Sequence, residues 1–175
     1  MATDIQVRTC APGDESALAL IGQATFLETF AGVLAGRDII SHCIKAHSVE
    51  LYRGWLASAD RRLWLAEVSP GSAPIGFMAT GPAELPLPDA SMKDLEIKRI
   101  YILGKFQGGG LGKELVMEAV ADARARKAER LLLGVYAHND AAIGFYARMG
   151  FRKLGTRKFS VGGRYYDDII MGLSL

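Results

Sequence analysis

Four glycines within five positions separate a strand-like segment from a helix-like segment in the second half of the chain. The strand-like run extends from Leu95 to Leu103 and the helix-like run from Leu111 to Arg126. Between them lie Gln107, Gly108, Gly109, Gly110, Leu111 and Gly112. Glycines expose the backbone, so successive N–H groups can converge on an anion, and the following helix adds the positive end of its dipole. The pattern therefore predicts a phosphate-binding turn between a strand and a helix.

Two well-known glycine loops do not fit this spacing. A Walker loop needs Gly five positions before the Gly of its Gly-Lys pair and Ser or Thr after the Lys, where this chain has Gln107 and Glu114. A dinucleotide fingerprint, Gly-x-Gly-x-x-Gly, fails from each starting glycine because its last position falls on Lys113, Glu114 or Leu115. The loop instead has the pattern Gln-x-x-Gly-x-Gly.

A second segment, residues 134–151, agrees with the first. It contains Asn139, then Phe145 and Tyr146, and it closes on Gly150 and Phe151. Together with the glycine loop it resembles the paired motifs of the GNAT superfamily of acyl-CoA-dependent N-acetyltransferases. Two motifs in this order, separated by one helix and one strand, are far more specific than a glycine loop alone. The resemblance implies acetyl-CoA as the acyl donor and an amine as the acceptor.

Length and composition are those of an ordinary globular protein. The 175 residues can bury about two thirds of their unfolded surface, so we expect one N-acetyltransferase domain over residues 1–175. The net charge of +2 is too small to indicate a nucleic-acid partner, and the basic run from Arg124 to Arg130 is typical of a solvated helix end. Met1–Thr9 lacks the apolar run of a signal peptide and no segment resembles a membrane span, so we expect a cytoplasmic protein.

The cysteines and histidines offer little support for a disulfide or a metal. Cys10 and Cys43 predict no disulfide in a reducing compartment. Cys43 lies beside His42 and near His47, but these residues supply only three donors. A spacing of five residues would place the two histidines about 140° apart on a helix. We therefore predict no metal.

Hydrophobic periodicity predicts the other elements of an α/β chain. The expected strands cover residues 5–9, 62–68, 75–80, 95–103, 130–136, 151–159 and 165–173. The expected helices cover 15–30, 38–57 with a break near His47, 111–126, and a segment capped by Asn139 or Asp140 and ended by Gly150. Asp14 is predicted to cap the first helix, and the predicted core of the second is Ile40, Ile44, Leu51, Trp55 and Leu56. The alternation indicates one mixed central sheet with helices on both faces. The resemblance adds that the sheet is mostly antiparallel and that its central strands splay apart.

Aminolysis of a thioester determines the chemistry that the site must perform. An alkylamine with a pKa of about 10 must lose a proton before it attacks, and the tetrahedral intermediate needs donors for its oxyanion. The leaving thiolate needs a proton or a positive field. The resemblance assigns Tyr146 as the general acid, the alternative being a core aromatic near a helix end. It assigns Glu96 as the leading base, the alternative being a strand-end carboxylate paired with Lys98 or Arg99.

The resemblance also implies which residues contact the cofactor. The main chain of Ile100, Tyr101 and Ile102 would line the pantetheine arm and supply the oxyanion donor. The pyrophosphate would be surrounded by Gln107, Gly108, Gly109, Gly110, Gly112 and Lys113. Phe145 would pack against the pantetheine or the core, and Asn139 would bind the cofactor or cap its helix. Many relatives carry a lysine or arginine where this chain has Gly109, so the backbone N–H groups and Lys113 must supply the phosphate binding.

The two ends of the chain indicate an acceptor. Residues 24–30 and the tail around residues 158–171 resemble the bacterial spermidine and spermine (PaiA-like) acetyltransferases. A polyamine site should present carboxylates to ammonium groups. Glu28 and Glu84 are the predicted substrate-binding residues; further candidates are Asp89, Asp167 and Asp168, and Glu28, Glu84 and Asp168 are also substitutes for the base. Other amines, including protein N-termini and lysines, stay open because a fold does not determine the substrate.

Two functions of other classes also stay open. A non-catalytic acyl-CoA-binding module would bind CoA without releasing thiol on any amine, but the presence of both Tyr146 and Glu96 favours an enzyme. A nucleotide-binding protein would let ATP or NAD compete with acetyl-CoA, and the failed Walker and dinucleotide spacings argue against it. The sequence leaves the oligomeric state open, and the resemblance suggests a homodimer formed through the C-terminal strands.

Overall fold

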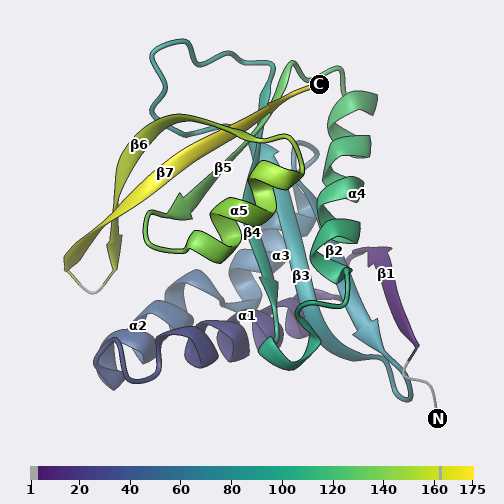
Figure 1. The fold of residues 1–175 in the computed structure, drawn as a ribbon. Helices are drawn as coiled ribbons and strands as arrows, with labels where there is room; N and C mark the ends of the chain where they lie inside the picture. The colour runs from purple at the N-terminus through teal and green to yellow at the C-terminus, as the bar shows by residue number, and fades with distance from the viewer. Residues whose placement is uncertain (1–3, 162) are drawn as a thin grey trace. The chain divides into compact units, whose positions relative to one another are not determined.

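The computed structural model describes residues 4–161 and 163–175. In this part of the chain a seven-stranded sheet has the strand order β1-β2-β3-β4-β5-β7-β6 and is flanked by helices (Figure 1). The strands are β1 (Ile5–Thr9), β2 (Arg62–Val68), β3 (Ala73–Pro82), β4 (Asp94–Ile102), β5 (Arg130–Tyr136), β6 (Arg152–Val161) and β7 (Arg164–Ser174). The helices are α1 (Glu15–Phe30), α2 (Gly36–Ala46), α3 (Val49–Ala57), α4 (Leu111–Ala125) and α5 (Asp140–Arg148), with a short 3-10 helix η1 (Gly104–Phe106). Strands β4 and β5 are parallel, whereas the pairs β1–β2, β5–β7 and β6–β7 are antiparallel, so the mixed α/β sheet is confirmed.

Most element boundaries agree with the prediction. Strands β1, β2 and β5 and helix α1 begin and end at the predicted residues, and the break near His47 separates α2 from α3. Strand β3 is longer than predicted because Pro74 and Pro82 indicated breaks, whereas proline is tolerated near strand ends. No helix in the described residues is both long and apolar enough to cross a bilayer.

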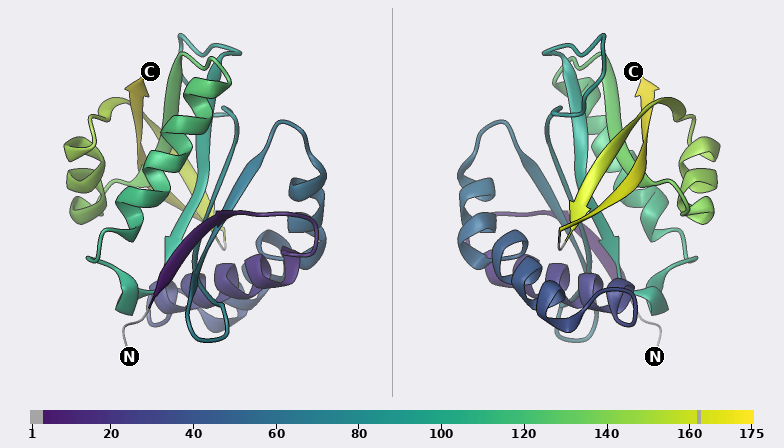
Figure 2. Two further views of the ribbon diagram at one scale, coloured as in Figure 1. Left: turned by 90° about the vertical axis from the view of Figure 1, so that its right-hand side faces the viewer. Right: turned by 90° about the vertical axis from the view of Figure 1, so that its left-hand side faces the viewer.

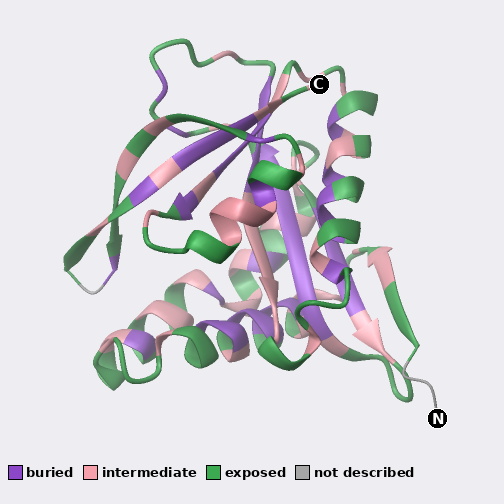
Figure 3. Ribbon diagram, viewed as in Figure 1, coloured by how far each residue is buried: buried purple, intermediate pink, exposed green. Residues whose placement is uncertain are grey.

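The structure divides into two units, and the first runs up to Ala79 and includes Arg99–Leu115. Helices α1 and α3 pack on one face of strands β2 and β3, as the views in Figures 1 and 2 show. The fully buried side chains of this core include Leu18, Tyr52, Leu65 and Phe77. Burial of each such side chain contributes about 1.5–3 kcal/mol relative to exposure. Figure 3 shows the result on α1, where buried and exposed positions lie on opposite sides.

Two predicted core residues of this unit are exposed. Ile40 and Ile44 are 62% and 65% exposed, whereas Ile39 is 6% exposed. The inner side of α2 carries Ile39 and the half-buried Cys43, one helical turn apart. Ile40 and Ile44 each lie one position further, about 100° around the helix. The prediction chose the wrong side because both sides of α2 carry apolar residues.

Asp14 lies at the N-cap position of α1 but does not cap it with its side chain. Its φ and ψ of −84° and −4° are helical, whereas a capping residue is extended. Its carboxylate instead accepts hydrogen bonds from the Arg8 guanidinium at 2.8 and 2.9 Å and from the Ala11 N–H at 2.8 Å. The Arg8 bonds also hold the pKa of Asp14 below its ordinary value. The side-chain cap was therefore a wrong prediction.

The second unit consists of Thr80–Lys98 and Val116–Leu175. The parallel β4–β5 register runs from the pair Asp94–Arg130 to the pair Ile97–Leu133, although both strands continue beyond it. Strands β6 and β7 form a long antiparallel hairpin (Figure 2) with an irregularity between Lys153 and Gly155. The predicted turn at 161–164 includes residue 162, which lies outside the described residues.

Candidate functional site

The glycine loop lies between η1 and α4 in the first unit. Gly108 and Gly110 have φ angles of +81° and +92°, a region that other residues rarely adopt. A Cβ added at Gly108, Gly109 or Gly110 would meet nothing within 4 Å, so the backbone conformation, not crowding, requires glycine at the first and third positions. The three glycines are exposed, and the 15-residue helix α4 begins directly after them. Exposed N–H groups at a helix N-terminus are the arrangement that binds phosphate.

Gln107 closes this loop back onto strand β4. Its Nε2 donates to the Ile102 carbonyl oxygen at 2.9 Å. The N–H of Leu103, the residue after Ile102, donates to the Ile75 carbonyl oxygen at 3.0 Å. Lys113 is exposed in the first turn of α4, and Leu111 is buried and anchors the start of that helix. Gln107 therefore has a structural role in the turn, which the motif alone did not reveal.

Ile100, Tyr101 and Ile102, the predicted pantetheine segment, are half-buried at the end of β4. The Tyr101 ring lies 5.7 Å from the Phe77 ring and 6.0 Å from the His47 ring, centroid to centroid. Its side chain is thus part of the core of the first unit, while its main chain lies on the strand.

The Glu28 carboxylate accepts a hydrogen bond from the main chain. Its Oε2 accepts from the Gly104 N–H at 2.8 Å, at the first residue of η1. A carboxylate at a helix N-terminus is stabilised by the unpaired N–H groups there. The bond links α1 to the segment that leads into the glycine loop, and nothing in the local sequence around Glu28 could have predicted it.

Glu96 and Lys98 form a buried ion pair in the second unit. The Glu96 Oε2 lies 2.8 Å from the Lys98 Nζ, and the two side chains are 7% and 9% exposed. The same Glu96 oxygen accepts from the Glu84 N–H at 2.9 Å, and the Lys98 Nζ donates to the Glu84 Oε2 at 2.9 Å. The predicted alternative of a Glu96–Lys98 pair is thus observed, and it does not exclude a catalytic role. Alternation along a strand already puts residues 96 and 98 on one face.

Helix α5 carries the predicted general acid. Tyr146 is 7% exposed, and its ring lies 5.1 Å from that of Phe145 and 5.7 Å from that of Phe151. The Asn139 side chain caps the helix by accepting from the Ala142 N–H at 3.1 Å, as predicted. The helix ends before Gly150, whose φ of +94° suits the predicted C-terminal glycine.

The other acidic candidates in the second unit are all paired. Asp168 is buried and accepts from the Arg157 Nε at 3.1 Å. Asp89 pairs with Arg130 at 2.9 Å, and Asp167 pairs with Lys158 at 2.6 Å. Each of these carboxylates therefore already has a cation partner supplied by the chain.

The thiols are poor nucleophiles. Burial raises the pKa of Cys10 to about 12 and also raises the pKa of Cys43, so both stay protonated at neutral pH. No group of three or more His, Cys, Asp or Glu side chains in the described residues is arranged to hold a metal ion. His47 lies just past the end of α2, so the rings of His42 and His47 are 5.8 Å apart and the helical angle used in the prediction does not apply.

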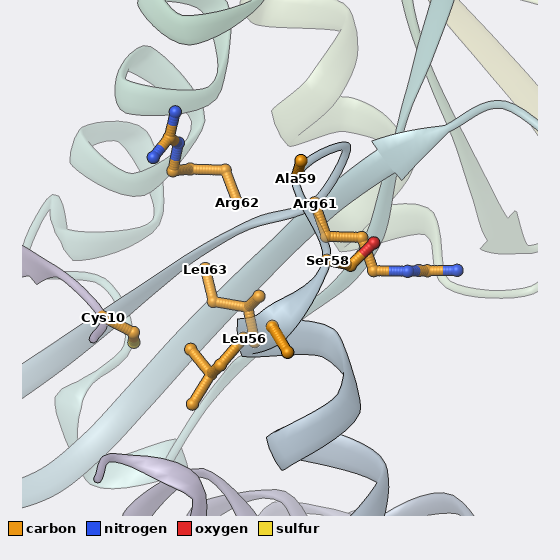
Figure 4. A pocket seen from close by; sticks show the side chains of 8 residues that line it. Cys10, Leu56, Ser58, Ala59, Arg61, Arg62 and Leu63 are labelled. Carbon is orange, nitrogen blue, oxygen red and sulfur yellow. The ribbon is translucent and has the colours of Figure 1, made fainter. Parts of the chain in front are cut away.

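An open pocket of about 240 Å³ lies elsewhere in the first unit (Figure 4). Its lining comes from the end of α3, the start of β2 and Cys10, and includes Leu56, Ser58, Arg61, Arg62 and Leu63. None of the site residues predicted from sequence belongs to it.

Similarities to known proteins cover most of the chain. Residues 36–151 match the model of the acetyltransferase (GNAT) family. An uncharacterized N-acetyltransferase of Mycobacterium bovis is 35% identical over 79 residues, 45% of this chain and 51% of the relative, so the match spans about half of that relative's length. The peptidyl-lysine N-acetyltransferase YjaB of Salmonella typhimurium is 30% identical over 132 residues, 75% of this chain and 77% of the relative. The solved structure of the PaiA N-acetyltransferase of Thermoplasma acidophilum in complex with coenzyme A has a TM-score of 0.74 at 20% identity, over 98% of this chain and 99% of that one. At 20% identity, the similarity to the PaiA structure shows a shared fold.

Proposed function

Because the chain belongs to the acetyltransferase (GNAT) family, we propose that it transfers an acetyl group from acetyl-CoA to a primary amine. The observation that carries the proposal is the exposed loop with positive φ at Gly108 and Gly110, directly before α4 and within the residues that match the family model. Its N–H groups suit the pyrophosphate, with Lys113 as the nearby cation. The main chain of Ile100–Ile102 would line the pantetheine arm, and Asn139 and Phe145 would make further contacts with the cofactor.

Glu96 is the proposed base. Both hydrogen bonds described for this carboxylate use Oε2, which leaves Oε1 to accept a proton from the amine or from a water molecule. A carboxylate must be ionised to accept a proton. Lys98 and the Glu84 N–H also restrain the carboxylate in one orientation.

Tyr146 is the proposed general acid. Its phenol would donate a proton to the departing thiolate, so that the thiol leaves neutral. The buried position among Phe145 and Phe151 restrains the ring, because an aromatic side chain packed on neighbouring rings has little rotational freedom.

Substitution of these two residues tests the assignment. We expect Tyr146→Phe and Glu96→Gln each to lower turnover about 10²-fold or more, because each removes a proton-transfer group. Turnover is measured by thiol release from acetyl-CoA, and CoA affinity is measured separately by calorimetry. Tyr165→Phe is a matched control that makes the same substitution at an exposed tyrosine outside the proposed site. Unchanged turnover in Tyr146→Phe would contradict the role of general acid.

We propose two candidate acceptor classes. Polyamines are suggested by the two ends of the chain and by the fold likeness to the PaiA enzyme. Glu28 and Glu84 would hold the ammonium groups through their carboxylates. Peptide amines are suggested by the similarity to peptidyl-lysine acetyltransferase YjaB. A panel of spermidine, spermine, amino acids, aminoglycosides and lysine peptides in the thiol-release assay separates these classes.

We further propose a cytoplasmic protein made of a single N-acetyltransferase domain. The unpaired Cys10 and Cys43 suit a reducing compartment. Exposed Leu154, Phe159 and Tyr165 on the β6–β7 hairpin support a homodimer formed through the C-terminal strands. Sedimentation velocity would contradict the dimer by finding only a monomer at micromolar concentration.

A further inference from the structure

Arg99 is a half-buried cation in the first unit that binds only neutral partners. Its Nη1 donates to the Tyr52 hydroxyl at 2.8 Å and to the Ala46 carbonyl oxygen. The guanidinium carbon lies 4.6 Å from the centroid of the Trp55 ring. A guanidinium has five N–H donors, and two of them are on Nη1. The three donors on Nε and Nη2 have no acceptor among the residues that the structure describes.

The groups around Arg99 do not neutralise its charge. Tyr52 is fully buried, and burial raises the pKa of its phenol, which therefore stays protonated. His47 is 1% exposed, and burial followed by the charge of Arg99 lowers its pKa to about 3, so it is neutral. The Tyr52 oxygen lies 2.8 Å from the His47 Nδ1 and accepts a hydrogen bond from Arg99. The cation is thus oriented by this network without being paired.

A second arginine shares the same indole. The guanidinium carbon of Arg61 also lies 4.6 Å from the Trp55 ring centroid. The two guanidinium carbons are therefore no more than twice this distance apart. No carboxylate within ion-pair distance of Arg61 or Arg99 is present in the described part of the chain. The side chain of Arg61 points away from that of its neighbour Arg62 (Figure 4).

Other half-buried arginines of this protein, in contrast, are paired with carboxylates. Arg8 binds the carboxylates of Asp14 and Glu67, and Arg130 binds those of Asp89 and Asp94. A partly buried guanidinium without a counter-ion carries a desolvation cost, and a second cation at the same ring adds repulsion. An anion bound at this point would relieve both.

We infer that Arg99, Arg61 and Trp55 form a carboxylate-binding site, here called the arginine clamp, and that its ligand is the carboxylate of the acceptor amine. The Nε and Nη2 of a guanidinium form a planar fork that matches the two oxygens of a carboxylate. Arg99 directly precedes Ile100–Ile102, the segment proposed to line the pantetheine arm. The inference rests on the proposed function and names its substrate class: an amine that also carries a carboxylate.

Matched pairs of amines test this class directly. L-Lysine and cadaverine differ only by a carboxylate, as do L-ornithine and putrescine. We expect kcat/KM for the amino acid to exceed that for the diamine by about tenfold to a hundredfold, as charge-assisted hydrogen bonds would provide. Arg99→Met should remove this preference by lowering kcat/KM for the amino acid while leaving the diamine within about threefold. Arg99→Lys should retain a part of it, because it keeps the charge and loses the fork.

Neighbouring substitutions control for indirect effects. Arg61→Met should weaken the preference, whereas Arg62→Met, one position further along the chain, should leave it unchanged. CoA affinity and the thermal midpoint are measured for each variant, so that loss of folding is recognised. A wild-type enzyme that prefers diamines, or an Arg99→Met variant that slows both members of each pair equally, would overturn the inference.

Direct binding of a carboxylate separates failure of the clamp from failure of the proposed function. Glutarate, which has no amine, is titrated into wild type, Arg99→Met and Arg62→Met by calorimetry. Binding to wild type and Arg62→Met but not to Arg99→Met supports the clamp even if no amine is acetylated, in which case the proposed function fails alone. Absence of glutarate binding to wild type counts against the clamp even if the enzyme is active. Glutarate binding without a carboxylate preference in turnover overturns the assignment of the ligand to the acceptor.

Discussion

At the scale of single residues, His47 makes the stability of this protein depend on pH. It is 1% exposed, and burial followed by the charge of Arg99 lowers its pKa from 6.5 to about 3. The unfolded chain therefore takes up a proton near pH 6.5, whereas the folded protein does not until about pH 3. Stability is fully present above pH 6.5 and falls progressively between these two values.

Substitution of His47 tests this dependence. In the wild type, we expect the free energy of unfolding to fall by about 2 kcal/mol between pH 7 and pH 5 because of His47. The variant His47→Asn should lose most of this pH dependence while keeping a hydrogen-bonding partner for Tyr52. Urea denaturation at several pH values measures it. His42 has a lowered pKa for the same reasons and adds a smaller slope of the same sign. The exposed His138, replaced in His138→Asn, serves as the control. Equal slopes in wild type and His47→Asn would contradict the assignment.

The residues that the sequence predicted well are those whose role is local. The Asn139 cap and the glycine after α5 follow from backbone geometry within a few positions. Asp14 lies at the predicted N-cap position, but its carboxylate accepts hydrogen bonds from Arg8 instead of capping the helix. The contact of Glu28 with Gly104 spans 76 positions, and no local pattern encodes it.

At the scale of elements, Gly22 allows α1 to approach the corner between α2 and α3. A Cβ at Gly22 would lie 2.3 Å from the His47 Nδ1 and 2.9 Å from the Tyr52 oxygen, both buried. We expect Gly22→Ala to destabilise the protein by about 1–3 kcal/mol, since overpacking displaces buried groups. Gly54→Ala is the matched control, because a Cβ there meets nothing within 4 Å and alanine favours the helix by about 0.5–1 kcal/mol. Chemical denaturation of both variants should give effects of opposite sign.

The glycine loop offers a second comparison at this scale. Gly110 has a φ of +92°, which a β-branched residue does not tolerate, and its N–H lies at the start of α4. We expect Gly110→Val to abolish measurable binding of CoA by calorimetry. Gly109→Ala should retain most of the affinity, because Gly109 has no positive φ and an added Cβ there meets nothing within 4 Å. Full CoA affinity in a folded Gly110→Val protein would exclude the loop as the phosphate site.

Periodicity located the elements more accurately than it assigned their buried sides. Helix α1 and strand β1 begin and end at the predicted residues, because their hydrophobic pattern and their end signals predict the same element. Helix α2 has isoleucines at 39, 40 and 44, and only packing against α1 decides that Ile39 is inside. Periodicity locates a helix, but it does not choose between two apolar sides.

At the scale of the whole molecule, the two motifs were sufficient to predict the fold class and the family. The α/β alternation and the pairing order of the sheet follow from elements that each form locally and then stack in few ways. The acceptor could not be predicted in the same way, because the charges that select it are decided by which side chains neutralise one another. The carboxylates expected for a polyamine in the second unit are paired with cations of the chain, whereas Arg61 and Arg99 have no carboxylate partner among the described residues.

Ligand linkage tests the family function on the intact protein. A ligand that binds only the folded state at 100 times its Kd adds about 2.7 kcal/mol, which raises the midpoint of a chain of this size by about 5–10 °C. We expect acetyl-CoA and CoA to produce this shift in a thermal scan. ATP and NAD should produce little shift at equal concentration, because the loop lacks the Walker and dinucleotide spacings. Gly110→Val should lose the shift and Tyr146→Phe should keep it, since the first alters the loop and the second removes only a hydroxyl. A shift with ATP or NAD as large as that with CoA would instead favour a nucleotide-binding protein.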